Sequence, residues 1–219
     1  MDRRRRGALW RLGRVEYEDG QLLMDRMVAA RKAGVVPDSL FLLEHPHTIT
    51  LGRRAQHHHV LLNEAASARL GVGIFETGRG GDVTYHGPGQ VVGYPILDLK
   101  PDRQDAHAYV RDLEEVMIRA LGDFGIQAGR VPGLTGVWVG DEKIAAIGVR
   151  VTTRTVTKHG FAINLNTDLS YFDGIIPCGI RDKGVTSLSR LQGTPVSMQA
   201  FSAALIAHFG QIFDHAMKF

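Results

Sequence analysis

The chain has 219 residues with 44% hydrophobic and 22% charged side chains, a composition typical of a globular protein that buries its own core. No apolar run reaches about 18 residues, the length that a membrane-spanning helix needs. The net charge of +3 comes from scattered basic residues without interleaved aromatic residues, which argues against nucleic acid binding. One cysteine allows no internal disulfide, and we expect a cytoplasmic protein.

The N-terminus is basic, with four arginines from Arg3 to Arg6. No apolar segment with a small-residue cleavage site follows them, so a signal peptide is not indicated. We interpret residues 1–9 as a disordered basic tail, because patterned sequence begins at Trp10. The whole chain, residues 1–219, is expected to form a single domain that works as a monomer.

The first half of the chain alternates between helical spacing and short apolar runs. These patterns predict a helix, a strand, a helix and two strands at residues 18–31, 40–43, 63–70, 72–77 and 91–97. Asn63 is positioned to cap the second of these helices. Pro95 lies inside the last run and indicates an edge strand or a bulge.

The second half contains the strongest amphipathic pattern. We predict a helix, a two-strand hairpin, a further strand and a C-terminal helix at residues 105–124, 137–139, 144–151, 161–165 and 197–217. The segment from Gly140 to Lys143 reads as the polar turn of the hairpin, and Ser197 as the cap of the last helix. Irregular alternation of strands and helices favours an α+β fold, in which helices flank a mixed β-sheet, over a doubly wound sheet.

The glycine-rich segment from Arg79 to Gln90 follows a predicted strand and is the densest candidate for a site. Gly80 and Gly81 allow the backbone to approach a ligand, and His86 adds a polar group. The segment has neither the Gly-Lys-Ser/Thr of a P-loop nor a G-x-G-x-x-G pattern. Most glycine-rich loops are only turns. The combination of the glycine pair with Thr84, His86 and the following Gly-Pro-Gly is therefore more specific than the glycines alone.

Cys178 stands between Pro177 and Gly179, a setting typical of a presented side chain rather than of a core residue. A thiol with an ordinary pKa of about 8.5 needs a nearby cation or imidazole to become a nucleophile at neutral pH. Lys143, His86 and His159 are candidates for that role. The plainer interpretations are an inert buried cysteine and an exposed lysine in the hairpin turn.

Other polar clusters are weaker candidates. Three consecutive residues cannot all face one ion, so the run His57–His59 indicates a solvated loop rather than a metal site, and no metal is expected. His45 and His47 flank Pro46 and belong either to a pocket or to a surface turn. The run Thr186–Ser189 lacks the glycines of a nucleophile elbow.

Several ordered segments closely resemble one known family, the lipoyl(octanoyl) transferases. The resemblance runs from about Trp10 into the C-terminal helix. The matching segments are Arg79–Gln90, Lys143–Arg150, His159–Asn166, Pro177–Ile180 and Val185–Leu188, preceded by Leu43–Arg53. It implies the fold of biotin and lipoate protein ligases.

The resemblance also implies a reaction. Such enzymes move an octanoyl group from octanoyl-acyl carrier protein to a lysine of lipoyl domains, which occur in 2-oxoacid dehydrogenase complexes and in the glycine cleavage H protein. Cys178 would carry the acyl group as a thioester, and Lys143 would lower the pKa of Cys178 and move protons. The donor is already a thioester, so neither ATP nor another cofactor is needed.

By the same resemblance, three segments would line the acyl and lysine channel. Small residues there suit a narrow tunnel for eight carbons, and backbone amides could stabilise an oxyanion. A basic surface would guide the acidic carrier protein. The substrate-binding residues would be Arg79, Gly80, Gly81, Asp82, Val83, Thr84, Tyr85, His86, Ala146, Ile147, Gly148, His159, Gly160 and Phe161.

Four alternatives stay open. An ATP-dependent lipoate or biotin protein ligase would share the fold but need a nucleotide site, and no Gly-Arg-Gly-Arg motif is present. An octanoyl amidotransferase would carry its nucleophile elsewhere in the chain. A non-catalytic module that binds lipoyl domains would not need both Lys143 and Cys178. A thiol hydrolase would pass the acyl group to water.

Overall fold

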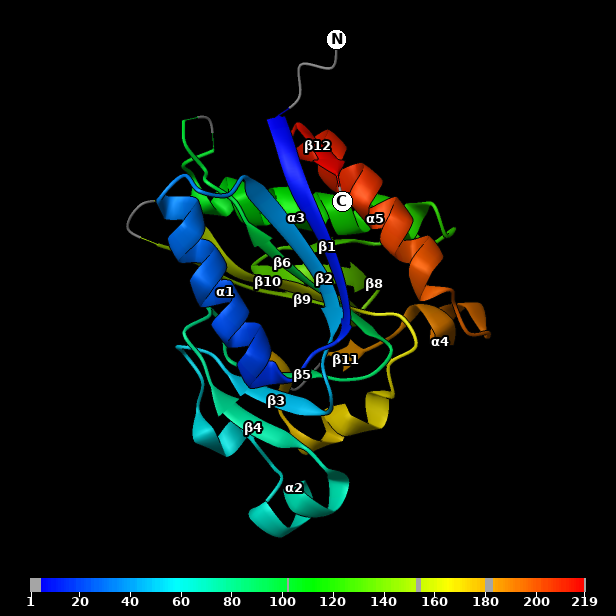
Figure 1. The fold of residues 1–219 in the computed structure, drawn as a ribbon. Helices are drawn as coiled ribbons and strands as arrows, with labels where there is room; N and C mark the ends of the chain where they lie inside the picture. Colours follow the sequence, from blue (N-terminus) through cyan, green and yellow to red (C-terminus); the bar gives the residue numbers. More distant parts are fainter. Residues whose placement is uncertain (1–4, 102, 153–154, 180–182, 219) are drawn as a thin grey trace.

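The computed structural model describes residues 5–101, 103–152, 155–179 and 183–218, which form one large and one small sheet (Figure 1). β1 is parallel to its neighbours β2 and β12, whereas the pairs from β2 across to β7 are antiparallel. The predicted mixed sheet of an α+β fold is therefore confirmed. Within the described residues the large sheet has nine strands, in the order β12 (His215–Lys218), β1 (Arg5–Arg14), β2 (Asp38–Glu44), β6 (Gln90–Ile96), β10 (Thr157–Asn164), β9 (Glu142–Val151), β8 (Leu134–Val139) and β7 (Gly129–Val131), with β11 (Gly184–Val185) beside β9.

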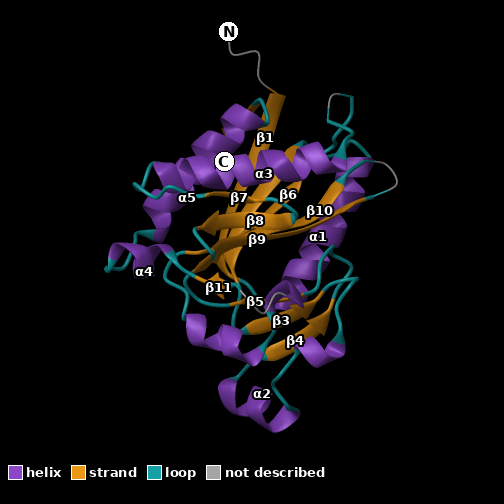
Figure 2. Cartoon of the chain, turned by 180° about the vertical axis from the view of Figure 1, so that it is seen from behind, coloured by secondary structure: helices purple, strands orange, loops and turns teal. Residues whose placement is uncertain are grey.

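Helices cover both faces of this sheet. α3 (Ala106–Gly122) and α5 (Met198–Ile212) pack on one face, and α1 (Tyr17–Lys32) packs on the other (Figures 1 and 2). Leu113 of α3 and Phe201 of α5 are fully buried against the first face, and Met24 of α1 is buried against the second. Each such side chain contributes about 1.5–3 kcal/mol by leaving water. Among the described residues, no helix is long and apolar enough to cross a membrane.

The small sheet lies beyond one end of the large sheet (Figure 1). Its strands run in the order β4 (Gly73–Glu76), β3 (Thr48–Leu51), β5 (Val83–His86). Ile49, Val83 and Tyr85 form the centre of a separate apolar cluster there. The remaining elements are α2 (Glu64–Leu70), α4 (Leu188–Gln192) and the 3-10 helices η1 (His57–His59), η2 (Leu169–Gly174) and η3 (Pro177–Gly179).

Local capping explains where several helices begin. The Asn63 side chain accepts a hydrogen bond from the Ala66 amide at 2.9 Å, and Asp105 caps α3 in the same way. Ser197 accepts from the Ala200 amide at 3.2 Å and starts α5. These caps satisfy amides that have no partner within the helix, and they confirm the helix starts expected at Asn63 and Ser197.

Both ends of the chain differ from the prediction. β1 begins at Arg5 and Leu9 is buried, so the expected tail is wrong for residues 5–9, while residues 1–4 lie outside the described part. The arginines concealed an alternating strand pattern in which Gly7 and Leu9 face inwards. The C-terminal helix ends at Ile212 rather than near 217, and after Asp214 at φ +56 the chain forms β12.

Pro95 does not mark an edge. β6 lies between β2 and β10 inside the sheet, so the edge expectation is wrong. The ladder from β6 to β10 runs only from Gln90 to Gly93, which places Pro95 beyond its end on that side. The missing proline N–H is therefore not needed there, and the Pro95 carbonyl instead accepts a hydrogen bond from the Thr157 hydroxyl at 2.7 Å.

Candidate active site

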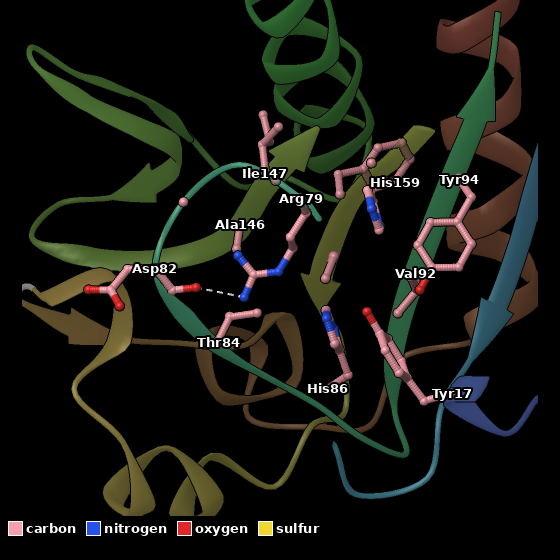
Figure 3. A pocket seen from close by; sticks show the side chains of 15 residues that line it. Tyr17, Arg79, Asp82, Thr84, His86, Val92, Tyr94, Ala146, Ile147 and His159 are labelled. Carbon is pink, nitrogen blue, oxygen red and sulfur yellow. Dashed lines mark hydrogen bonds between the residues drawn. The ribbon is translucent and has the colours of Figure 1, made fainter. Parts of the chain in front are cut away.

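A narrow pocket lies where the large sheet meets β5 and the loop from Arg79 to Asp82 (Figure 3). Its wall on the large sheet comes from β6, β9 and β10, and α1 adds Tyr17. We call it the acyl pocket, after the ligand that the resemblance implies. Its lining residues are Tyr17, Arg79, Gly81, Asp82, Thr84, His86, Val92, Tyr94, Ala146, Ile147, Gly148, His159, Gly160, Phe161 and Ala162.

Small residues on paired strands keep this pocket narrow but open. Ala146 lies opposite Ala162, and Gly148 lies opposite Gly160, in the antiparallel ladder of β9 and β10. A Cβ at Gly148 would come within 2.9 Å of Arg79 Cδ and 3.0 Å of the Gly80 carbonyl oxygen. The glycine-rich loop therefore rests directly on the backbone of β9, where only glycine fits.

Arg79 shapes the loop that closes the pocket. Its buried guanidinium donates to the Thr50 carbonyl at 2.6 Å and to the Asp82 carbonyl at 2.7 Å, and the latter bond is dashed in Figure 3. A further bond reaches the Gly80 carbonyl at 3.0 Å. Because these acceptors lie on β3 and on the loop itself, Arg79 fixes the loop against the small sheet.

Buried histidines form part of the pocket wall and are neutral at pH 7. Burial lowers the pKa of His86 to about 3, and neighbouring His45 adds to the effect. Burial also lowers the pKa of His45 to about 4. The Val15 carbonyl lies 2.6 Å from His45 Nδ1 and requires a proton there, so His45 Nε2 accepts from the Tyr94 hydroxyl at 2.7 Å.

His86 is oriented by a chain of amides. Its Nδ1 donates to Gln90 Oε1 at 2.8 Å, and Gln90 Nε2 donates to Asn164 Oδ1 at 2.9 Å. Asn164 in turn donates to the Thr186 carbonyl at 3.0 Å. This network fixes the tautomer of His86 and leaves its Nε2 as an acceptor.

His159 is held in an unusual backbone conformation, with φ +62. Burial lowers its pKa to about 3, and the charge of Lys158 adds to the shift. Its Nε2 has no hydrogen-bond partner among the described residues. Figure 3 shows Tyr17, His86 and His159, from three different elements, directed towards the same space.

Lys143 lies in a strand rather than in a turn. The hairpin turn is formed by Gly140 and Asp141, and β9 begins at Glu142. Lys143 is only 8% exposed, and its Nζ lies 4.8 Å from the centroid of the Trp138 ring, a cation–π arrangement. The expectation of an exposed turn lysine is therefore wrong.

The Cys178 side chain lies outside the described part of the structure, but its two neighbours are placed. Pro177 lines a small cavity together with Lys143, Thr84, Ala146 and Ala162. The last three of these residues also line the acyl pocket, so the cavity and the pocket adjoin. The peptide that carries Cys178 thus runs beside Lys143, at the end of the acyl pocket.

Gly179 fixes the other side of that peptide. It has φ +69, and a Cβ there would lie 3.1 Å from both Asp82 Oδ2 and His59 Cε1. His59 is buried and its Nδ1 lies 2.6 Å from Asp82 Oδ2, whereas His57 and His58 are exposed. The expected solvated loop is therefore wrong for His59, the one member of the run that turns inwards.

Comparison with known proteins shows the family to which this chain belongs. The model of the lipoyl protein ligase A/B catalytic domain matches residues 16–210. This chain belongs to that family. It is 52% identical over 210 residues to an octanoyltransferase of Solibacter usitatus, covering 96% of this chain and 94% of the relative. An octanoyltransferase of Koribacter versatilis is 48% identical over 92% of this chain and 82% of its own.

Solved structures agree on the fold. A putative lipoate protein ligase of T. acidophilum with bound lipoic acid superposes with a TM-score of 0.74 at 17% identity, covering 97% of this chain and 88% of that one. The expected lipoate ligase-like fold is confirmed.

The structure brings most of the predicted substrate-binding residues of this family member together. Gly80 borders a neighbouring cleft rather than the acyl pocket. Val83 and Tyr85 point to the opposite face of β5, into the small apolar cluster, because side chains alternate along a strand. The predicted residues that line the pocket are Arg79, Gly81, Asp82, Thr84, His86, Ala146, Ile147, Gly148, His159, Gly160 and Phe161.

Sequence reasoning missed part of the pocket wall. Tyr17, Val92, Tyr94 and Ala162 also line it. Val92 and Tyr94 occupy alternate positions of β6, and Ala162 is two residues beyond Gly160 on β10. The two-residue period of each strand could have identified these three, whereas Tyr17 comes from α1 and needed the tertiary structure.

Proposed function

We propose that this member of the family is an octanoyltransferase that moves octanoyl from octanoyl-acyl carrier protein to a lysine of lipoyl domains, the first step of protein lipoylation. The observation that carries the proposal is the adjacency of Lys143, Pro177 and the acyl pocket at one point of the fold. The identity of 52% to a relative named octanoyltransferase supports it.

In the first half-reaction, the Cys178 thiolate attacks the carbonyl carbon of the donor thioester. A new carbon–sulfur bond to Cys178 forms, the bond to the carrier sulfur breaks, and the carrier thiol leaves with a proton. Lys143 holds and returns that proton, since it is buried and lines the same cavity as Pro177. The octanoyl chain lies across Ala146 and Ala162, which form part of the same pocket wall.

In the second half-reaction, the amine of the acceptor lysine attacks the new thioester. An amide bond forms and the bond to Cys178 breaks, while Lys143 takes the proton that the amine loses and passes it to the Cys178 sulfur. The pocket favours a hydrocarbon chain because burial keeps His86 and His159 uncharged, so the chain replaces water rather than the hydration of an ion.

The partners follow from this reaction. We propose octanoyl-acyl carrier protein as donor, and the lipoyl domains of 2-oxoacid dehydrogenase complexes and the glycine cleavage H protein as acceptors. We further propose that the enzyme works as a monomer in the cytoplasm, where a reduced thiol persists. Relatives of the same fold include a lipoate-protein ligase solved with bound ATP, so the test must separate transfer from ATP-dependent ligation.

The test is the intact mass of the protein after mixing with octanoyl-acyl carrier protein in the absence of ATP. We expect one octanoyl adduct on the wild type, released by a lipoyl domain, and none on Cys178→Ser. Lys143→Met should slow adduct formation by at least about 100-fold, as expected for loss of a group that transfers protons. No adduct on the wild type, together with ATP-dependent modification of a lipoyl domain, would overturn the proposal in favour of a ligase.

A further inference from the structure

A second opening lies next to the acyl pocket, with which it shares Gly81, Asp82, Ile147 and Gly148. It is a cleft of about 420 Å³ between the Gly80–Asp82 loop and the turn from β7 to β8. We call it the side cleft. Its lining residues are Arg54, Gly80, Gly81, Asp82, Val110, Gly133, Leu134, Thr135, Lys143, Ile147, Gly148 and Val149.

The side cleft exposes a stretch of strand edge. The last pair between β8 and β9 is Val137 with Ala145, and the next backbone bond on this edge runs from the Gly80 amide to the Val149 carbonyl at 3.0 Å. Backbone groups of alternate residues point to the same edge of a strand, so those of Ile147 share the edge with Val149. Within the described residues no strand lies opposite Ile147 on this edge.

The conformation of Gly136 and its hydrogen bond to α3 explain why the pairing of β8 with β9 stops before Ile147. Gly136 has φ +124, and a Cβ there would lie 2.6 Å from the Ala145 carbonyl oxygen. Its amide donates to Glu114 Oε1 of α3 at 3.0 Å, and the Glu114 side chain is fully buried. A buried carboxylate therefore draws β8 away from β9 just before Ile147.

The side cleft leads from the surface to the proposed reaction point. At its inner end lies Lys143, which also borders the cavity of Pro177. Asp82 lines the cleft and contacts the position of a Gly179 Cβ, next to Cys178. At the outer end, Arg54 is exposed, and its backbone amide donates to the Gly81 carbonyl at 3.1 Å.

We propose that the side cleft binds the phosphopantetheine arm of the acyl donor, with the arm's amides paired to the backbone at Ile147 and its phosphate near Arg54. This inference rests on the proposed function. The arm is an extended chain with two amide groups, and such a chain can add to an open strand edge. The acceptor lysine has only methylenes between its backbone and its amine, so it has no group for this edge.

The test compares two small donors that share the octanoyl thioester. Octanoyl-pantetheine carries both amides, and S-octanoyl-2-mercaptoethanol carries none. The rate of octanoyl-enzyme formation is measured by quenched intact mass in single turnover. Two hydrogen bonds correspond to a preference of about 10- to 100-fold for octanoyl-pantetheine in the wild type.

Thr135→Trp places a large side chain in the side cleft from an exposed position on β8. We expect it to remove the preference, so that octanoyl-pantetheine reacts no faster than the amide-free ester. Transfer from preformed octanoyl-enzyme to a lipoyl domain should keep its wild-type rate. Gln127→Trp, an equal addition at an exposed position outside the cleft, is the matched control.

Arg54→Gln gives an independent measurement that does not change the shape of the cleft. It should slow acylation by octanoyl-phosphopantetheine about 3- to 10-fold and leave octanoyl-pantetheine unaffected, since an exposed charge pair is weak. Equal slowing of both small donors by Thr135→Trp, or slowed transfer to the lipoyl domain instead, would overturn the inference. If octanoyl-acyl carrier protein acylates the wild type but octanoyl-pantetheine shows no advantage over the amide-free ester, the inference fails and the proposed function stands. If the carrier-bound donor does not acylate the wild type either, the proposed function itself fails.

Discussion

His59 and Asp82 join the loop that closes the acyl pocket to the segment that carries the proposed nucleophile. His59 Nδ1 lies 2.6 Å from Asp82 Oδ2, and both side chains are largely buried. The His59 carbonyl accepts a hydrogen bond from the Ile176 amide at 2.8 Å, two residues before Cys178. Gly179 rests on the pair, because its missing Cβ would contact both side chains.

This arrangement predicts a positioning role for His59. Replacing it by alanine leaves the Asp82 carboxylate without its imidazole partner and frees the peptide around Cys178 to shift. We expect His59→Ala to lower the single-turnover rate of octanoyl-enzyme formation about 10- to 100-fold, because small displacements of a reacting group are costly, with little change in KM for the donor. The neighbouring His58→Ala changes an exposed residue and is the control.

A merely structural role would give a different result. It would reduce the fraction of folded enzyme without changing the rate per folded molecule. His59→Gln, which can still donate a hydrogen bond to Asp82, should recover part of the lost rate. Wild-type acylation by folded His59→Ala would contradict the positioning role.

Glu114 provides a stability prediction away from the chemistry. Its fully buried carboxylate accepts from Arg111 at 2.5 Å, from Arg130 at 2.9 Å and from the Gly136 amide at 3.0 Å. Glu114→Gln keeps the shape but loses the charge, so we expect a loss of about 1–3 kcal/mol in the free energy of unfolding, measured with urea.

Glu115 is the matched control, because it pairs with Arg119 and Arg130 at the surface. Glu115→Gln should cost less than about 1 kcal/mol, as exposed ion pairs do. Equal losses for the two variants would show that burial of the Glu114 carboxylate is not what makes it important.

Local sequence signals predicted much of the fold. The caps at Asn63 and Ser197 and the spacing of apolar residues in α3 act within a few residues, so the sequence reveals them directly. The hairpin of β8 and β9 was also predicted, with Lys143 assigned to the turn instead of the strand. That error arose because the polar run from Gly140 to Lys143 carries no signal for where the turn ends and β9 begins.

Long-range contacts account for what the sequence did not reveal. The burial of His59 depends on Asp82, 23 residues away, whose carboxylate accepts a hydrogen bond from the imidazole. The strand after α5 forms because β1 offers it a parallel partner, an edge that arginine-rich sequence concealed. Tyr17 joins the pocket wall through the packing of α1 on the sheet. None of these relationships leaves a periodic signal within one segment.

The depth of the acyl pocket predicts a chain-length effect. Ala146 and Ala162 face each other across paired strands, and Ala146 is directed towards the pocket in Figure 3. Ala146→Val adds two methyl groups to the path of the chain. Since one methylene is worth about 0.8 kcal/mol, we expect the ratio of kcat/KM for octanoyl over hexanoyl donors to fall about 4- to 20-fold.

Ala146→Ser, which adds little volume, should leave that ratio near the wild-type value. The measurement is acylation by octanoyl and hexanoyl carrier protein under identical conditions. If Ala146→Val slows both donors by the same factor, the pocket lined by these two strands does not hold the acyl chain.

The buried histidines predict how stability depends on pH. Their pKa values are about 3 for His86 and His159 and about 4 for His45 in the folded protein, against about 6.5 in the unfolded chain. Between these values the unfolded state binds more protons, so stability is present above about pH 6.5 and is lost as pH falls. Each histidine can cost about 2 kcal/mol at pH 5.

His159→Asn removes the contribution of one histidine to this pH-dependent loss of stability, because asparagine does not titrate. Asparagine also tolerates the positive φ of that position. Asp38, whose pKa is lowered from 3.8, acts at lower pH and does not interfere between pH 7 and 5. Urea unfolding at these two pH values should show a loss that is smaller by about 2 kcal/mol in His159→Asn than in the wild type. An unchanged loss would mean that His159 is protonated in the folded protein near pH 5, which is incompatible with an uncharged histidine beside the acyl chain.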